Sequence, residues 1–268
     1  MTTKGGKTLL FALFASAAIL ISRPSMAQSA RPIKVETLNL ENSLVINFVR
    51  VPQDKATVRV LAARVPILER AAQGSNPERA ASGYSLNEYL TRYGAMVVLS
   101  GGYIDSYSPP TPLGLLRSQG LQINPIHRSW LLQGLFCSNE DNVEITLVDM
   151  DPLRRNFRDC VQGGPVMLLD GKVARDPSIE NNENYRRFAN ARIARTFVCI
   201  DRRKDVIVGL GEKSDLSNFV SALRGSELGC IDAIGLTGAQ SGGMWAGKKL
   251  FGNDDFLFPS VIAVMPKS

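Results

Sequence analysis

The stretch Leu236-Thr-Gly-Ala-Gln-Ser-Gly-Gly-Met-Trp245 is a glycine-rich loop that follows a strand-like run, Ile231 to Leu236. Earlier in the chain, Met96-Val-Val-Leu-Ser-Gly-Gly-Tyr103 has the same arrangement. Because glycine has no side chain, a ligand can approach the backbone of such loops closely. We therefore expect both loops to be walls of a binding pocket, and we expect them to lie side by side if their strands pair.

A helix with its own start and stop signals precedes each of these strands. Ser85 with Glu88 three residues later is a capping-box pattern, and Gly94 can end the first helix. Ser214 can cap the second helix, and Gly225 can end it. Apolar residues recur with helical spacing in both segments, so each helix should bury one face.

Strand-like segments outnumber these helices. They cover residues 33–36, 44–49, 57–61, 95–99, 143–148, 165–169, 195–201, 205–210, 231–236 and 258–265. The pair 195–201 and 205–210 predicts a hairpin through the charged turn 202–204. The expected fold class is α+β, with a mixed, mostly antiparallel sheet and a few covering helices in a single large domain.

Residues 1–27 have the features of a secretory signal. Lys4 and Lys7 give a basic start, Thr8 to Ser22 is almost free of polarity, and Ser25-Met-Ala27 is a small-x-small cleavage pattern. The apolar run is short for a membrane span, although a retained anchor is the alternative. We expect a periplasmic or secreted domain, residues 28–268, without a transmembrane anchor after cleavage.

The basic charge of the chain belongs partly to this segment. Removal of residues 1–27 lowers the formal net charge from +6 to about +3. The remaining short basic runs are scattered, whereas nucleic-acid binding usually needs a clustered basic face. Nucleic acid is therefore not an expected partner.

Four cysteines remain in the domain, and an even count in an exported chain suggests disulfides. Three connectivities are possible. We predict Cys137–Cys160 and Cys199–Cys230, and the second pair would join two strand-like segments that flank the second helix. Free buried thiols are the alternative.

The sequence gives little support for a metal site or for a serine hydrolase. The cysteines lack the close C-x-x-C pairs of a zinc site, and Asp149-Met-Asp151 offers too few oxygen ligands for calcium. His127 is the single histidine, in a polar loop where a surface position is more common than a catalytic one. Gly238-Ala-Gln-Ser241-Gly misplaces the serine of a G-x-S-x-G elbow by one residue. We expect no metal and no cofactor.

Two further features suit an anionic or sugar ligand. Gln162-Gly-Gly164-Pro165 is a third glycine turn, whose accessible N–H groups can hold a phosphate or a sugar hydroxyl. Arg195, beside Thr196 at a strand start, carries a guanidinium that suits bidentate binding of phosphate or carboxylate. A tight turn and an arginine on a solvent face are the alternatives.

The order of these motifs resembles the phosphodiester glycosidase family, whose uncovering enzyme removes N-acetylglucosamine from a sugar phosphodiester. The resemblance spans roughly residues 33–265. The matching segments are Ser100-Gly101-Gly102-Tyr103, Pro112-Leu-Gly-Leu115 with Gly120, Gln162-Gly-Gly-Pro165, Arg195-Thr196 and Leu236-Thr-Gly238-Ala-Gln-Ser241. Gly102, Gln162, Arg195, Gly238 and Ser241 match the family pattern and are candidate pocket residues.

Three positions depart from that pattern. Ser100 replaces an asparagine, Thr237 replaces an aspartate, and Ala239 replaces the second glycine of the last loop. A threonine hydroxyl cannot supply the charge of a carboxylate at neutral pH. Asp105 or Asp232 would then have to supply the missing acid or base. Together with Thr237, which stands at the aspartate position, they are the candidate catalytic residues.

The resemblance implies a hydrolase that cleaves the glycosidic bond of a sugar phosphodiester or a related glycan. In that interpretation Arg195 and the loop N–H groups hold the phosphate. The sugar would be positioned by Ser100, Gln162 and Ser241, with Tyr103, Gly164 and Thr196 completing the binding set. The alternative is a non-catalytic relative that binds glycan or sugar phosphate in envelope or exopolysaccharide processes. A structural or protein-interaction role is the third hypothesis.

Overall fold

All ten predicted strand segments occur as strands in the computed structural model, which describes residues 33–40, 43–63, 83–150, 156–174, 180–225, 227–238, 241–253 and 255–267. Each strand pair in this part of the chain is antiparallel. The strands form three larger sheets and one small hairpin rather than one sheet. The fold is thus α+β with mostly antiparallel sheets and few helices.

The largest sheet has seven strands in the order β1-β2-β15-β14-β16-β12-β13. Its members are β1 (Val35–Asn39), β2 (Val45–Val51), β12 (Val166–Leu169), β13 (Lys172–Val173), β14 (Ile193–Asp201), β15 (Val206–Ser214) and β16 (Cys230–Gly235). The predicted hairpin is β14–β15, and it occupies the middle of the sheet.

The other two large sheets have five strands each. One has the order β18-β17-β4-β19-β3, with β3 (Ala56–Ala62), β4 (Val97–Ser100), β17 (Met244–Trp245), β18 (Lys249–Phe251) and β19 (Ser260–Pro266). The other has the order β10-β9-β11-β7-β8, with β7 (Leu116–Ser118), β8 (Leu121–Asn124), β9 (Gly134–Ser138), β10 (Val143–Leu147) and β11 (Asp159–Gly163). The hairpin is β5 (Ile104–Tyr107) with β6 (Pro110–Pro112).

The core lies where these sheets face one another. One apolar cluster combines Val198 and Val208 of the seven-stranded sheet with Val60 and Ile262 of the second sheet and Phe136 of the third. All five side chains are buried. Residues from distant parts of the sequence therefore share one core, which fixes how the sheets are arranged.

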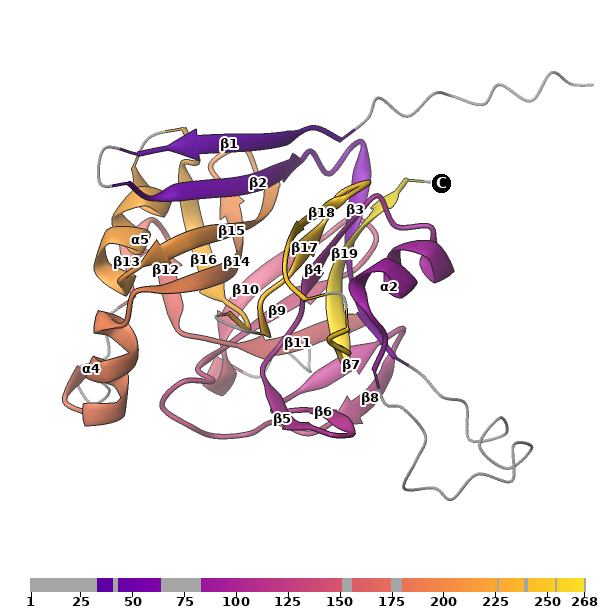
Figure 1. Cartoon of the computed structure of the whole chain (residues 1–268), viewed down its shortest axis with the longest axis horizontal. Helices are drawn as coiled ribbons and strands as arrows, with labels where there is room; N and C mark the ends of the chain where they lie inside the picture. The colour runs from indigo at the N-terminus through magenta and orange to yellow at the C-terminus, as the bar shows by residue number, and fades with distance from the viewer. Residues whose placement is uncertain are drawn as a thin grey trace, which may run out of the picture. The chain divides into compact units, whose positions relative to one another are not determined.

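Three α-helices cover the outer faces of this described part: α2 (Leu86–Tyr93), α4 (Glu183–Asn190) and α5 (Leu216–Arg224). In Figure 1, α4 and α5 lie on the side of the seven-stranded sheet, and α2 lies over β4 and β19. A short 3-10 turn, Val148–Met150, follows β10. None of the helices in the described ranges is long and apolar enough to cross a membrane.

The predicted N-cap is confirmed for α2 and is wrong for α5. Ser85 and Glu88 form the predicted capping box of α2, and Gly94 ends that helix in the left-handed conformation, with φ of 64°. The N-cap of α5 is Asp215, whereas Ser214 was predicted. Ser214 still belongs to β15, and the carboxylate of Asp215 accepts a hydrogen bond from the N–H of Asn218.

The predicted disulfide connectivity is confirmed: Cys137 bonds Cys160 and Cys199 bonds Cys230. The first bridge joins residues that are directly opposite on β9 and β11. The second ties β14 to the start of β16. Together they leave no free thiol in the chain.

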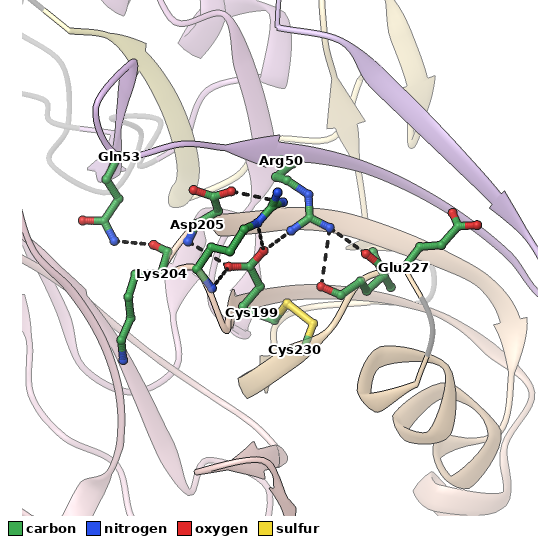
Figure 2. A network of polar contacts seen from close by, with 10 residues as sticks. Arg50, Gln53, Cys199, Lys204, Asp205, Glu227 and Cys230 are labelled. Atoms are coloured by element: carbon green, nitrogen blue, oxygen red, sulfur yellow. Dashed lines mark hydrogen bonds and ion pairs between the residues drawn. A yellow bond between two sulfur atoms is a disulfide. The ribbon is translucent and has the colours of Figure 1, made fainter.

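A polar network lies beside the second bridge (Figure 2). The buried carboxylate of Asp201 pairs with Arg50 of β2, and it accepts hydrogen bonds from the N–H groups of Arg203 and Asp205 at 2.8 and 3.0 Å. Arg50 also donates to the carbonyl of Glu227 at 2.8 Å. One ion pair thus links β2, the β14–β15 turn and the segment before β16.

Candidate functional site

A pocket of about 220 Å³ opens between the seven-stranded sheet and helices α4 and α5. Five of the predicted ligand-binding residues line it: Tyr103, Gly164, Arg195, Thr196 and Gly238. Its other walls are mostly apolar, and they include Met167, Phe188, Ile193, Leu216, Phe219 and Leu236. A mostly apolar cavity with a few polar groups is the usual form of a small-molecule site.

The two glycine loops lie side by side, as predicted. The N–H of Thr237 donates to the carbonyl of Gly101 at 3.1 Å, and the N–H of Gly243 donates to Ser100 Oγ at 3.1 Å. The preceding strands do not pair, because β4 and β16 belong to different sheets. The contact arises instead because β17, which follows the second loop, pairs with β4.

The glycines of these loops are needed for close packing of the protein against itself. A Cβ atom on Gly238 would lie 2.6 Å from the carbonyl oxygen of Ala194, and one on Gly101 would lie 2.4 Å from Ser260 Oγ. At Gly164 the nearest atom would be the carbonyl oxygen of Leu131, at 1.6 Å. Larger residues would therefore push apart the segments that build the pocket.

Arg195 brings the one full charge to the described pocket wall. Its side chain is buried, and Nε donates to the carbonyl of Ser214 at 3.1 Å. One terminal nitrogen donates to the carbonyls of Phe188, in the last turn of α4, and of Ala191, the C-cap residue of that helix, at 3.0 and 2.9 Å. These contacts hold the guanidinium rigidly, and no described residue accepts from the other terminal nitrogen.

The carbonyls around Arg195 carry only partial charges, and no described carboxylate lies within ion-pair distance of it. Burial lowers the pKa of Arg195, while Tyr103 and Asp215 oppose that shift. An arginine stays protonated in proteins despite such a shift. Among the described residues, the cation of this pocket therefore has only backbone carbonyls as direct partners and the more distant charge of Asp215, an environment that favours an anionic ligand.

Two aromatic side chains frame this cation. The guanidinium lies over the ring of Phe188, 4.7 Å from its centroid. The hydroxyl of Tyr103 donates to the carbonyl of Gly164 at 2.8 Å, and burial raises the pKa of Tyr103 well above its ordinary value. Tyr103 is therefore a neutral hydroxyl group at neutral pH, and it cannot neutralise Arg195.

The structure places Gln162 outside this pocket. Its amide oxygen accepts from the N–H groups of Leu115 and His127 at 2.8 and 2.9 Å. Its amide nitrogen donates to the carbonyls of His127 and Leu132 at 2.6 and 2.9 Å. All of these partners belong to the protein backbone, so Gln162 positions the loop before β9 and has no donor left for a sugar.

The remaining predicted binding residues do not line this pocket. Ser100 and Gly101 are buried where the two glycine loops meet, and Gly102 packs against Val161. The hydroxyl oxygens of Ser241 and Tyr107 lie 3.3 Å apart and share a hydrogen bond. Ala239 lies outside the described residues.

The three predicted catalytic residues are dispersed. Thr237 is buried, and its carbonyl accepts a hydrogen bond from Thr196 Oγ1, which itself lines the pocket. Asp105 is exposed on β5, two residues after Tyr103. Asp232 accepts from the N–H of Asp170 at 2.9 Å, toward the opposite end of β16 from the pocket. None of the described pocket-lining residues is acidic.

Sequence reasoning missed the aromatic wall. Phe188 lies on α4, which the sequence did not predict, and Trp130 packs edge-on against Phe188 and Tyr185 with centroid distances of 6.1 and 6.2 Å. Asn182, whose side chain caps α4, was an available signal for this helix. Within the described ranges, no three His, Cys, Asp or Glu side chains gather to hold a metal ion.

The structure thus combines antiparallel sheets with a mostly apolar pocket that contains one buried arginine. The sequence profile of phosphodiester glycosidases matches residues 93–264 and includes every motif at the pocket. The chain belongs to the phosphodiester glycosidase family. None of the curated proteins with which the chain was compared matches it.

Solved structures share the fold. The catalytic domain of zebrafish N-acetylglucosamine-1-phosphodiester alpha-N-acetylglucosaminidase, auto-inhibited by its pro-peptide, is 18% identical with a TM-score of 0.64, covering 88% of this chain and 82% of that one. A hypothetical protein from Synechocystis is 14% identical with a TM-score of 0.65, covering 89% and 64%. A candidate exported protein from Burkholderia pseudomallei is 10% identical with a TM-score of 0.57, covering 83% and 74%.

Proposed function

We propose that this chain binds the phosphate group of a sugar phosphate or sugar phosphodiester at Arg195. The observation that carries the proposal is the rigid, buried guanidinium on the pocket wall without a described carboxylate partner. A phosphate oxygen would supply the missing counter-charge through a short, charge-assisted hydrogen bond. The apolar walls would cover the C–H faces of the attached sugar.

The first test is binding of N-acetylglucosamine 1-phosphate, measured by calorimetry. Arg195→Gln removes the charge but retains an amide donor for the backbone carbonyls, and we expect it to weaken binding at least about tenfold. Arg192→Gln is the matched control, because Arg192 is exposed and does not line this pocket. Equal affinity in a correctly folded Arg195→Gln variant would contradict the proposal.

Binding without turnover is the function that the pocket geometry supports best, because Thr237 stands at the family's aspartate position and the described wall contains no acid. Hydrolysis of the glycosidic bond is the second candidate. Family membership favours it, and Asp105 on the hairpin after Tyr103 is the carboxylate we would assign to it.

The two candidates differ in one assay, the release of N-acetylglucosamine from a sugar phosphodiester. If the wild type is a binder, it releases no sugar, and the double change Ser100→Asn with Thr237→Asp introduces activity. Turnover by the wild type that is lost in Asp105→Asn, but retained in the exposed control Asp255→Asn, would establish the hydrolase instead.

We further infer that the domain works outside the cytoplasm, in the periplasm or the medium, where it would serve envelope or exopolysaccharide processes. The two disulfides support this inference, because such bonds persist in oxidising compartments. Residues 1–27 lie outside the described residues and are proposed as the signal. Expression of the whole chain in a secreting bacterial host should give a product that starts at Gln28, as read by mass spectrometry. An uncleaved, cytoplasmic product would contradict the inference.

A further inference from the structure

A second pocket, of about 390 Å³, lies where β15 ends and helix α5 begins. Its lining residues are Lys213 and Ser214 of β15, Asp215 and Asn218 at the start of α5, Ser43 and Leu44 before β2, and Arg192 before β14. None of them lines the pocket at Arg195. The volume is in the range of small-molecule sites, so the second pocket can hold a ligand of its own.

One buried hydroxyl group of this pocket lacks a hydrogen-bond partner. Ser214 is 5% exposed, and its Oγ has no partner among the described residues. The backbone holds this residue in place, because its carbonyl accepts from Arg195 Nε at 3.1 Å and Ser214 pairs with Ile193 across the hairpin. A buried polar group destabilises the native state unless a ligand or water satisfies it. The hydroxyl of Ser214 is therefore available to a ligand in the second pocket.

The charges of the second pocket favour a ligand with one negative charge. Arg192 and Lys213 are exposed, and neither forms an ion pair within the described part of the chain. Hydrogen bonds from the N–H and the amide nitrogen of Asn218, at 2.9 and 2.7 Å, lower the pKa of Asp215 against the effect of burial, so this carboxyl is ionised. Two cations and one anion leave a single positive charge. A carboxylate matches that charge, whereas a doubly charged phosphate would be repelled more strongly by Asp215.

The neutral groups of the second pocket suit the hydroxyls of a sugar. Ser43 adds another hydroxyl group, and the amide oxygen of Asn218 is left to accept, because its amide nitrogen donates to Asp215. A serine hydroxyl can both donate and accept. Buried Leu44 offers an apolar surface to C–H groups. A ring that carries one carboxylate and several hydroxyls, a hexuronic acid, matches this set of groups.

We propose that the second pocket binds a hexuronic acid residue of an acidic glycan. Arg192 and Lys213 hold its carboxylate, and Ser214 and Asn218 hold its hydroxyls. This site goes beyond the proposed function, because its ligand contains no phosphate, does not contact Arg195 and undergoes no reaction. The ligand residue occupies this one pocket alone. Because Arg192 and Lys213 are exposed, the neighbouring sugars of a glycan chain can extend into solvent.

The test compares three small ligands: methyl glucuronoside, methyl glucoside and acetate. Methyl glucoside lacks the carboxylate, and acetate lacks the sugar ring. Titrations are followed by NMR of the backbone amides of residues 213–218. We expect the wild type to bind methyl glucuronoside at least about tenfold more tightly than either of the others, as one charge-assisted hydrogen bond or two ordinary ones would give. A glucuronoside that binds no better than methyl glucoside or acetate overturns the site.

Arg192→Gln tests the cation assigned to the carboxylate. It should weaken the binding of methyl glucuronoside at least about fivefold, because a charged partner is replaced by a neutral one. Arg202→Gln is the matched control, since Arg202 is exposed in the β14–β15 turn and does not line this pocket. Unchanged affinity in Arg192→Gln, or an equal loss in both variants, overturns the proposal.

Ser214→Ala distinguishes a binding role from a structural one. Removal of a buried hydroxyl without a partner should leave the urea midpoint unchanged or raise it, yet it should weaken the binding of methyl glucuronoside about fivefold. A lower midpoint would show that the hydroxyl has a structural partner, and unchanged affinity would show that the ligand does not contact it. Either result overturns the site. Neither Arg192 nor Ser214 lines the pocket at Arg195 and no probe contains phosphate, so the proposed function would stand.

Discussion

Gln162 shows how a residue can match a family motif and yet act at a distance from the ligand. Its amide makes four hydrogen bonds to the backbone of residues 115, 127 and 132, and its side chain is fully buried. The loop that it fixes carries Trp130, which packs against Phe188 on the pocket wall. The shape of the pocket therefore depends on a residue that does not line it.

Gln162→Ala should lower the free energy of unfolding by about 3 kcal/mol, because it leaves several backbone groups without partners and creates a cavity. Urea denaturation followed by circular dichroism measures this loss. Gln122→Ala is the control, since Gln122 is exposed on β8 and its loss should change stability by less than about 0.5 kcal/mol. Equal stability of both variants would contradict the positioning role.

Asp232 gives a prediction about pH. Burial raises the pKa of this carboxyl, and the charges of Asp170 and Glu144 add to the effect, whereas the hydrogen bond from the N–H of Asp170 and the charge of Lys204 oppose it. A carboxyl with a raised folded pKa destabilises the fold above that pKa, and the penalty disappears as the pH falls toward the unfolded value of about 3.9. Asp232→Asn keeps the acceptor for the N–H of Asp170 and removes the charge.

We therefore expect Asp232→Asn to be slightly more stable than the wild type at pH 7, by less than about 1 kcal/mol. The difference should shrink as the pH approaches 4. Thermal unfolding at several pH values gives the comparison. A difference that grows on acidification would mean that the carboxylate stabilises the native state.

Site residues could be predicted where the side chain itself indicates a chemical role. They could not be predicted where tertiary packing determines the position of the side chain. Arg195 and Gly238 were predicted because a guanidinium suits an anion and bare backbone allows close approach, and both residues line the pocket. The sequence could not show that Asp232 lies toward the opposite end of β16, because distance in space depends on strand register. Nor could it show that the amide of Gln162 is already fully bonded.

At the scale of elements, the ion pair between Arg50 and Asp201 joins three parts of the seven-stranded sheet. Arg50→Ala would leave the buried carboxylate of Asp201 without its cation, so it should cost about 3 kcal/mol in unfolding free energy. Arg187→Ala is the control, because the exposed pair of Arg187 with Glu183 should contribute less than about 0.5 kcal/mol.

A double-mutant cycle with Asp201→Asn isolates the interaction, since asparagine can still accept from the turn N–H groups that Asp201 binds. In the Asp201→Asn background, the further change Arg50→Ala should cost clearly less than it does in the wild type. Full additivity would show that Arg50 acts through packing alone.

Elements with strong local patterns were predicted, and those held by tertiary contacts were not. Helix α2 has an apolar stripe and a capping box, and the β14–β15 hairpin has two apolar runs around a charged turn. Helix α4 buries no residue fully, and its apolar residues Tyr185, Phe188 and Ala189 form only a short stripe in an otherwise polar segment. The short strands β5 to β8 gain their pairing from neighbours rather than from alternation.

At the scale of the whole molecule, three sheets share one core, and their arrangement around it could not be predicted from the sequence. Strands distant in sequence lie side by side, as with β3 and β19 or β2 and β15. Only the antiparallel character and the approximate strand positions follow from local pattern. The pocket is lined by residues of β12, β14 and β16, whose pairings are also long-range, so its shape depends on the folding of the whole sheet.

The two disulfides are the covalent part of that stability, and they close loops with sequence separations of 23 and 31 residues. In the chain-entropy estimate each closure contributes about 3 to 4 kcal/mol, and the sum of the two is comparable with the total stability of an ordinary domain. The variants Cys137→Ala with Cys160→Ala and Cys199→Ala with Cys230→Ala should each unfold at clearly lower urea concentration. Only the second pair ties β14, which carries Arg195, to β16, which leads to Gly238, so its loss should also weaken ligand binding. If only the variant without Cys137 and Cys160 lost ligand binding, the pocket would depend on β9 and β11 more than on the strands that carry its cation.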